Sequence, residues 1–491
     1  MTQPANLATM SLPTNQLPYV RELPANFSIE KGFAVLSQLP GCIWFDSASR
    51  SIPGRSGDQP HLDRYSFITA DPIRRLVASI GDPNPWPQLH QWASELPNQS
   101  RSDLPPFQGG LAGLIGYEAG AWLEDVNIAA DNDLPTAALS VGLYDWTIAV
   151  DHEQGKASLI CQGLCVDGTT SLDVAVQRAD QIETLLSDCR ESEGSDDANS
   201  KAVDRSTLQT PDYAADTPSN FTSESFRGAV ADIVGRIRKG DCFQVNLAQR
   251  LLRDVDCPPS ELYQRLRKTN PAPFGGYYDG GDFTVLSSSP EGFLSVRGSL
   301  VETRPIKGTI SRTGNAHLDA LLAEQLRDSA KDRAENVMIV DLMRNDLSRV
   351  CTDESVTVTQ LCQVERYQYV QHLVSVVQGY IREDASVVDL LEACFPGGSI
   401  TGAPKIEAMR VIAELEPNPR GPYCGSLGYI SCGGNADFNI LIRTITATQH
   451  HWQIPVGGGI TARSIPSAEE AETWAKAKGM LQAIANEESL S

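Results

Sequence analysis

The chain has 491 residues, of which 41% are hydrophobic and 21% are charged, and its formal net charge at pH 7 is −22. This composition is typical of a soluble globular protein that is large enough for two or more domains. The excess of negative charge argues against binding to nucleic acid or to an anionic membrane. An anionic substrate would therefore need local attraction from arginine, lysine or a metal ion.

The first twenty residues lack the basic and apolar regions of a secretory signal, and no apolar run is long enough to span a membrane. The eleven cysteines occur without any CxxC pair. We therefore expect a cytoplasmic protein with reduced thiols, without a disulfide framework or a zinc site.

In chain order, residues 15–190 alternate between short strands and helices, and residues 191–225 form a polar linker. A region at 226–487 follows, beginning with an amphipathic helix that stops at Gly240 before a strand. Later in the chain, the sequence predicts one long helix over 317–350 and one strand over 438–448. Neighbouring strands joined by turns favour an α+β fold with antiparallel sheets.

Two predicted helices carry paired acids. Asp332 and Glu335 share one helix face, and Glu469 and Glu472 repeat the spacing, with Lys476 one turn further on. Four such carboxylates could enclose Mg²⁺. Acids in a first helical turn are also favoured by capping and by the helix dipole, so each pair alone has a purely structural explanation.

Two glycine-rich segments, 395–405 and 454–464, could bring backbone N–H groups close to a carboxylate. Arg443 interrupts an apolar run and needs an anionic partner, which could be a protein side chain or a substrate. His372 lies in a probable strand, where a structural role and a role as proton donor both remain open. Lys307 stands in a segment punctuated like a tight turn, where a solvated lysine and a nucleophile are the alternatives.

Seven motifs occur in a fixed order: SPEGF, TRPIKGT, KDRAENVMIVDLMRNDL, QHLVS, FPGGSITGAPK, GPYCGSLGYI with ADFNILIRT, and GGGI before the second acidic helix. Together they resemble the chorismate-utilising enzymes, which include the aminodeoxychorismate, anthranilate, isochorismate and salicylate synthases. The resemblance covers residues 222–487. It is weaker in the N-terminal region. It implies a layered sandwich of antiparallel sheets and helices, with the active site between two sheets.

The resemblance implies that Glu335 and Glu472 bind Mg²⁺ directly, and that Asp332 and Glu469 act through water. Relatives commonly have glutamate at the position of Asp332. The shorter aspartate extends less far toward the metal ion. The metal ion would neutralise the ring carboxylate of chorismate. The resemblance further implies substrate contacts from Thr309, Ser399, Thr401, Gly402, Tyr423, Arg443, Gly457, Gly458, Gly459 and Lys476.

Lys307 distinguishes between reactions within this family. Aminodeoxychorismate synthases resemble the chain in having this lysine, which is thought to form a covalent bond to the substrate, whereas anthranilate synthases usually have alanine. Glu291 matches the family's acid/base glutamate, and His372 matches the general acid of relatives or a positioning residue. The lysine needs a lowered pKa, for which Arg304 and the metal ion are candidate causes.

The resemblance extends to the isochorismate and salicylate synthases, which have a water-activating lysine at the position of Gln244. A glutamine cannot act as that base, so the resemblance favours ammonia as the nucleophile here. No glutaminase motif is present, which implies a separate glutamine amidotransferase subunit as partner. Ser47 and Ser66 match a pocket that holds tryptophan in relatives. The alternatives are an anthranilate synthase component I and an inactive scaffold for an amidotransferase.

Overall fold

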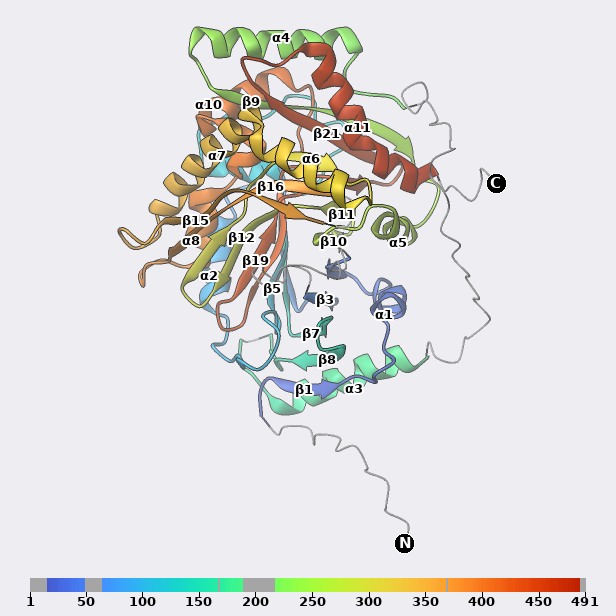
Figure 1. Cartoon of the computed structure of the whole chain (residues 1–491). Coiled ribbons are helices and arrows are strands. Elements are labelled where there is room, and N and C mark those ends of the chain that lie inside the picture. Colours follow the sequence, from blue (N-terminus) through green and yellow to red (C-terminus); the bar gives the residue numbers. More distant parts are fainter. Residues whose placement is uncertain (1–15, 49–63, 167, 189–216, 368–369, 486–491) are drawn as a thin grey trace.

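Two large antiparallel sheets form the centre of the molecule in the computed structural model (Figure 1). The structure describes residues 16–48, 64–166, 168–188, 217–367 and 370–485. Every strand pair among these residues is antiparallel. The predicted α+β sandwich is therefore confirmed.

Among the described residues, the larger sheet has eleven strands, in the spatial order β1 (Tyr19–Glu22), β8 (Lys156–Cys161), β7 (Trp146–Asp151), β3 (Tyr65–Thr69), β2 (Ile43–Asp46), β10 (Phe274–Asp279), β11 (Thr284–Ser289), β20 (Thr444–Ala447), β21 (His451–Ile460), β9 (Gln244–Asp254) and β17 (Gly402–Ala403). The second sheet has the order β14 (Ile306–Ser311), β16 (Val370–Tyr380), β13 (Leu300–Thr303), β12 (Gly292–Arg297), β19 (Ala436–Asn439), β18 (Ser426–Ser431), β5 (Gly110–Ile115), β6 (Leu139–Tyr144) and β4 (Arg74–Ala78), with β15 (Thr357–Arg366) paired to β16.

The helices of the described residues are α1 (Ile29–Leu36), α2 (Trp86–Ser94), the 3₁₀ helix η1 (Tyr117–Trp122), α3 (Leu172–Asp188), α4 (Ser223–Lys239), α5 (Pro259–Thr269), α6 (Ala316–Asp328), α7 (Ala330–Ser348), α8 (Val387–Cys394), α9 (Gly398–Thr401), α10 (Lys405–Leu415) and α11 (Pro466–Ala485). None of them is long and apolar enough to cross a membrane.

Apolar side chains hold the layers together. Phe67 and Tyr278 from the larger sheet pack against Leu114 and Leu427 from the second sheet. A second cluster lies between the larger sheet and helices α1, α3, α5 and α11, while helices α2, α7 and α8 join a third cluster with the second sheet (Figure 1). Burial of each large apolar side chain contributes about 1.5–3 kcal/mol, so these three clusters define the layered arrangement.

Both sheets combine strands from the two sequence regions that we predict at 15–190 and 226–487. Strand β2 pairs with β10, and β5 pairs with β18. Most of the predicted linker at 191–225 lies outside the described residues, and its last three residues, Ser223–Ser225, begin helix α4.

The helix predicted before Gly240 is confirmed as α4. Thr222 and Ser225 form a capping box at its start, and Gly240 ends it in the left-handed conformation with φ +94°. Three basic residues in the last turn face the negative end of the helix dipole. The strand that follows, β9, is also as predicted.

Two predicted elements are each divided in the structure. The helix predicted over 317–350 is two helices, α6 and α7, because Ser329 leaves the helical conformation (ψ 106°) and its side chain accepts a hydrogen bond from the Asp332 N–H as the N-cap of α7. The strand predicted over 438–448 ends at Asn439 and resumes at Thr444. Arg443, with φ +52°, lies in the break.

Candidate active site

Several predicted site residues lie on strands near one end of each sheet. Lys307 lies on β14 of the second sheet, whereas Gly457–Gly459 lie on β21 of the larger sheet beside β9. The four acids lie on α7 and α11, and the Phe395–Lys405 segment contains α9 and β17. The turn that the sequence indicated around Lys307 is not present, because the residue lies in strand β14. A β-bulge between Lys307 and Thr309 shifts the pairing register of this strand with β16.

Lys307 and Glu291 form the centre of the site, and Ser399 contacts both. The Lys307 ammonium donates a hydrogen bond to the backbone carbonyl of Ser399 at 2.8 Å. The Ser399 side chain hydrogen-bonds to the carboxyl of Glu291. One residue therefore fixes the distance between a basic group and an acidic group.

Burial shifts both pKa values toward the neutral forms. It lowers the pKa of Lys307, and Lys476 acts in the same direction, while Glu291, Glu335 and Glu472 oppose the shift. Burial also raises the pKa of Glu291, against the opposing effects of Lys307 and Ser399. A neutral amine and a protonated carboxyl are the forms needed for a nucleophile and a proton donor.

Arg304, a candidate cause of the lowered Lys307 pKa, is itself paired with two carboxylates. Its guanidinium forms ion pairs with Glu302 at 3.2 Å and with Glu365 at 2.5 Å. These two carboxylates compensate its charge. Burial is the largest cause of the lowered pKa of Lys307, and Lys476 acts in the same direction.

The acidic residues of α7 and α11 influence one another. Burial raises the pKa of Glu335, and the charges of Asp332 and Glu469 act in the same direction. One oxygen of Glu335 is buried without a hydrogen-bond partner in the described chain. The same oxygen lies 3.9 Å from the Lys331 amine, beyond hydrogen-bond distance. A carboxylate oxygen without a hydrogen-bond donor, near the acids Asp332 and Glu469, fits a divalent cation such as Mg²⁺.

Glycine residues make room for this cluster. A Cβ atom on Gly458 would lie 3.3 Å from the Lys476 amine and 3.5 Å from a Glu472 oxygen. A Cβ atom on Gly308 would lie 3.0 Å from the carboxyl carbon of Asp332. The β21 and β14 backbones therefore approach the acids from opposite sheets.

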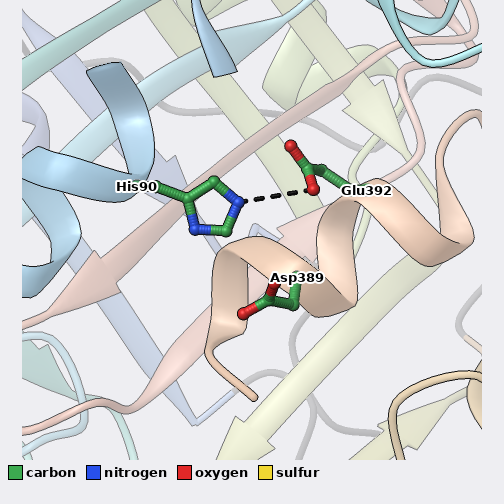
Figure 2. Close-up of side chains that lie close together, drawn as sticks. All are labelled: His90, Asp389 and Glu392. Atoms are coloured by element: carbon green, nitrogen blue, oxygen red, sulfur yellow. Dashed lines mark ion pairs between the residues drawn. The ribbon is translucent and has the colours of Figure 1, made fainter. Parts of the chain in front are cut away.

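The four acids do not lie close enough together to form a compact ligand set by themselves. Within the part of the chain that the structure describes, the one group with all ligand atoms within 4.8 Å is His90, Asp389 and Glu392, at the contact of α2 and α8 (Figure 2). His90 and Glu392 form an ion pair at 3.3 Å, and Asp389 accepts hydrogen bonds at the N-terminus of α8. These interactions explain the group as a helix–helix contact.

Lys476 and Arg443 supply positive charge on the α11 side. Lys476 contacts Glu472 and the Gly457 carbonyl, both at 2.7 Å. Burial alone would raise the pKa of Glu472, but the charge and hydrogen bond of Lys476, together with the charges of Lys331 and Arg443, lower it. Arg443 donates to the Lys476 carbonyl at 3.2 Å, and no described carboxylate forms an ion pair with it. Burial lowers the pKa of Arg443, which Tyr423 and Glu472 oppose. A buried guanidinium without a carboxylate is suited to an anionic ligand.

His372 is buried on β16 and pairs with Thr309, whose hydroxyl lies 2.9 Å from Nδ1. Burial, with a contribution from Arg443, lowers the pKa of His372 to about 4. The imidazole is therefore neutral near pH 7, which favours a role in positioning over proton donation as an imidazolium. Thr309 itself is exposed.

The remaining predicted residues hold the 395–405 segment against β9. Thr401 donates to the Gly397 carbonyl at 3.0 Å, and Gly402 pairs with Val245. Gln244 is fully buried, and its side-chain oxygen has no hydrogen-bond partner within the described residues.

Sequence reasoning missed a buried ionic network below this segment. Arg420 forms a bidentate pair with Glu416, and Glu118 accepts hydrogen bonds from the backbone N–H groups of Arg420 and Gly421. The i, i+4 spacing of Glu416 and Arg420 was the available signal. It gives no indication of burial, because such pairs are common on exposed helices.

A cavity of about 180 Å³ lies between the two sheets in the region predicted to hold tryptophan. Aromatic rings from Phe45, Phe67 and Tyr429 line it together with Ser47. Ser66 supports this wall, because its side-chain oxygen accepts a hydrogen bond from the Ser47 N–H at 3.1 Å.

The sequence matches a family model described as chorismate binding enzyme over residues 42–482. Component 1 of aminodeoxychorismate synthase from Salmonella typhimurium is 36% identical over 448 residues, which cover 88% of this chain and 92% of the relative. Component 1 of anthranilate synthase from Streptomyces coelicolor is 37% identical over 451 residues, which cover 89% and 83%. The chain is therefore similar over most of its length to enzymes with two different products.

A solved structure gives the same result for the fold. The crystal structure of anthranilate synthase component I from Streptococcus pneumoniae superposes with a TM-score of 0.72 at 30% sequence identity. The similarity covers 88% of this chain and 95% of that chain.

Proposed function

Because this chain belongs to the chorismate-binding enzyme family, we propose that it converts chorismate and ammonia to 4-amino-4-deoxychorismate, with Lys307 as a covalent nucleophile. Curated relatives named for aminodeoxychorismate synthase support this activity. The observation that carries the proposal is the position of Lys307, beside Glu291 and held by the Ser399 carbonyl at 2.8 Å.

The first step forms a bond between Lys307 Nζ and C2 of the ring. The ring double bond shifts and the C4–O bond breaks. Glu291 supplies the proton with which the hydroxyl leaves as water, and its raised pKa keeps that proton available.

The second step reverses the shift. Ammonia forms a bond to C4, the double bond returns, and the bond between C2 and Lys307 breaks. The Lys307 nitrogen, which became a secondary ammonium in the first step, leaves as the neutral amine. A proton from the added ammonia passes to the Glu291 carboxylate, which restores the starting state. The two displacements explain why the amino group arrives at the carbon that lost the hydroxyl.

The charges around Lys307 are suited to a dianionic substrate. Glu335 and Glu472, assisted by Asp332 and Glu469, would hold Mg²⁺, which supplies charge neutralisation for the ring carboxylate. Arg443 has no carboxylate partner within the described chain and would receive the enolpyruvyl carboxylate. These local positive charges overcome the net charge of −22.

A separate glutamine amidotransferase would supply the ammonia, which is supported by the "component 1" in the names of the relatives. The aromatic cavity beside Ser47 would hold tryptophan. Turnover with glutamine only after addition of the second subunit, and tryptophan-dependent stabilisation of the fold, would test these two points.

The decisive experiment uses the purified chain with chorismate, Mg²⁺ and ammonium at alkaline pH. We expect a product that retains the enolpyruvyl group by mass spectrometry and that becomes p-aminobenzoate only when a lyase is added. Fluorescent anthranilate formed without a lyase would favour the reaction of the anthranilate synthases, which the similarity to the Streptomyces enzyme makes the second candidate.

The role of Lys307 is tested by omitting ammonia. We expect a chorismate-derived adduct on the peptide containing Lys307, and a loss of turnover of about a thousandfold in Lys307→Ala. Lys156→Ala, which removes an exposed lysine on β8, is the matched control. Rapid turnover by Lys307→Ala would exclude an obligatory covalent step.

A further inference from the structure

The Ser399 carbonyl accepts two hydrogen bonds from side chains of different sheets. Lys307 Nζ donates to it at 2.8 Å, and Asn246 Nδ2 donates at 3.1 Å. A carbonyl oxygen has two lone pairs, so both positions are occupied. The Asn246 amide is therefore directly linked, through one atom, to the amine that the proposed reaction uses.

Asn246 is itself fixed on two sides. Its side-chain oxygen accepts a hydrogen bond from Gln244 Nε2 at 3.2 Å, and its backbone carbonyl accepts one from Arg420 at 3.2 Å. Arg420 also donates to the Ile400 carbonyl at 3.0 Å. One buried guanidinium thus binds both the strand that carries Asn246 and the segment that carries Ser399.

The surroundings of Lys307 explain why such a restraint is needed. The carboxylates of Glu291, Glu335 and Glu472 all attract the ammonium form of the lysine. A free lysine side chain has four rotatable bonds and would move toward these charges. The Ser399 carbonyl is the hydrogen-bond acceptor that holds Nζ in its present position.

We propose that Asn246 is a positioning residue for Lys307: its amide fixes the Ser399 carbonyl, and that carbonyl keeps the lysine amine directed at the substrate. The inference rests on the proposed function of Lys307. It adds a residue that does not touch the lysine but shares the Ser399 carbonyl with it. Asn246 contacts protein groups in this arrangement, so its removal should affect the chemical step more than substrate binding.

The test uses two variants of Asn246. Asn246→Ala removes the amide, and Asn246→Asp keeps the shape and the acceptor for Gln244 but cannot donate to the Ser399 carbonyl. Asn220→Ala is the matched control, because this half-buried amide also bonds to the β9 backbone, at Arg250 N, on a different part of the strand.

We expect kcat to fall by about tenfold or more in both Asn246 variants, while KM for chorismate stays within about twofold of the wild-type value. A purely structural role would disturb the whole 395–405 segment and would raise KM together with the loss of kcat. The control Asn220→Ala should keep both constants.

A second measurement needs no turnover. Lys307 is labelled with acetic anhydride and quantified by mass spectrometry relative to Lys156, which is exposed on β8. We expect labelling of Lys307 to be at least about threefold slower in both variants, because the released amine pairs with the neighbouring carboxylates and spends more time protonated.

Unchanged kcat and unchanged labelling in Asn246→Asp would overturn the proposal, and so would a KM that rises in parallel with the loss of kcat. If the wild-type protein forms no aminodeoxychorismate, the proposed function fails, and the labelling ratio still decides whether Asn246 positions the lysine. If Asn246→Ala does not fold, the isosteric aspartate variant carries both measurements.

Discussion

Replacing Glu416 with glutamine removes the charge that compensates a fully buried arginine. The side chains of Arg420 and Glu416 are 3% and 5% exposed, and their closest contact is 2.6 Å. Glu416→Gln preserves the shape of the side chain but leaves the guanidinium without a counter-charge. Loss of one partner of a buried ion pair costs about 3–5 kcal/mol of folding free energy.

Removing both partners should not restore the stability. The backbone groups Ile400 O, Asn246 O and Ala248 N all bond to this pair, and an Arg420→Leu, Glu416→Leu double variant leaves them without partners. At about 1 kcal/mol for each buried group, roughly 3 kcal/mol of destabilisation remains.

Urea denaturation followed by tryptophan fluorescence measures both variants. The matched control is Asp384→Asn, which breaks an exposed pair with Arg382 and should cost under about 1 kcal/mol. A Glu416→Gln variant as stable as this control would refute the reasoning, because it would show that the Arg420 charge is already compensated by other groups.

Three further predictions follow from the site. Burial raises the pKa of Glu118 from 4.5 to about 7, so the folded state holds the proton more tightly than the unfolded state does. The free energy of unfolding should therefore fall by about 3 kcal/mol as the pH rises from 4.5 to 7. Glu118→Gln should flatten the plot of unfolding free energy against pH over this range. Gly458→Ala should leave the melting temperature nearly unchanged but raise KM for chorismate about tenfold or more, because the added methyl group lies 3.3 Å from the Lys476 amine; an unchanged KM would place the substrate elsewhere. Chelation of divalent cations should abolish turnover, and Glu335→Gln should reduce Mg²⁺ affinity in calorimetry by at least about tenfold, more than Asp332→Asn does.

The sequence was sufficient for the elements that carry the acids. The i, i+3 spacing of Asp332 with Glu335 and of Glu469 with Glu472 identified two helix faces, and the structure has these pairs on α7 and α11. Local spacing determines which residues share a helix face, so this kind of prediction needs no information about distant parts of the chain.

Predictions that depended on tertiary contacts were less successful. Ser329 interrupts a pattern that is otherwise helical throughout, because its side chain caps the helix that follows. Arg304 is adjacent to the site in sequence, yet its charge is directed to Glu302 and Glu365 on neighbouring strands. The Ser399 carbonyl was invisible to any argument from side-chain types, because every residue has a backbone carbonyl and only the fold selects one.

Strands from the two sequence regions pair with each other in both sheets, so the contact between the regions resembles the interface of a two-chain complex. A chain cut between residues 188 and 217 would still have Trp44 opposite Tyr277, and Gly113 opposite Gly428, in continuous hydrogen-bonded ladders. The two fragments would therefore remain associated as an obligate pair does. Each fragment alone would expose long unpaired strand edges and would aggregate. One half could therefore not be replaced by the corresponding half of a relative unless the other half were replaced with it.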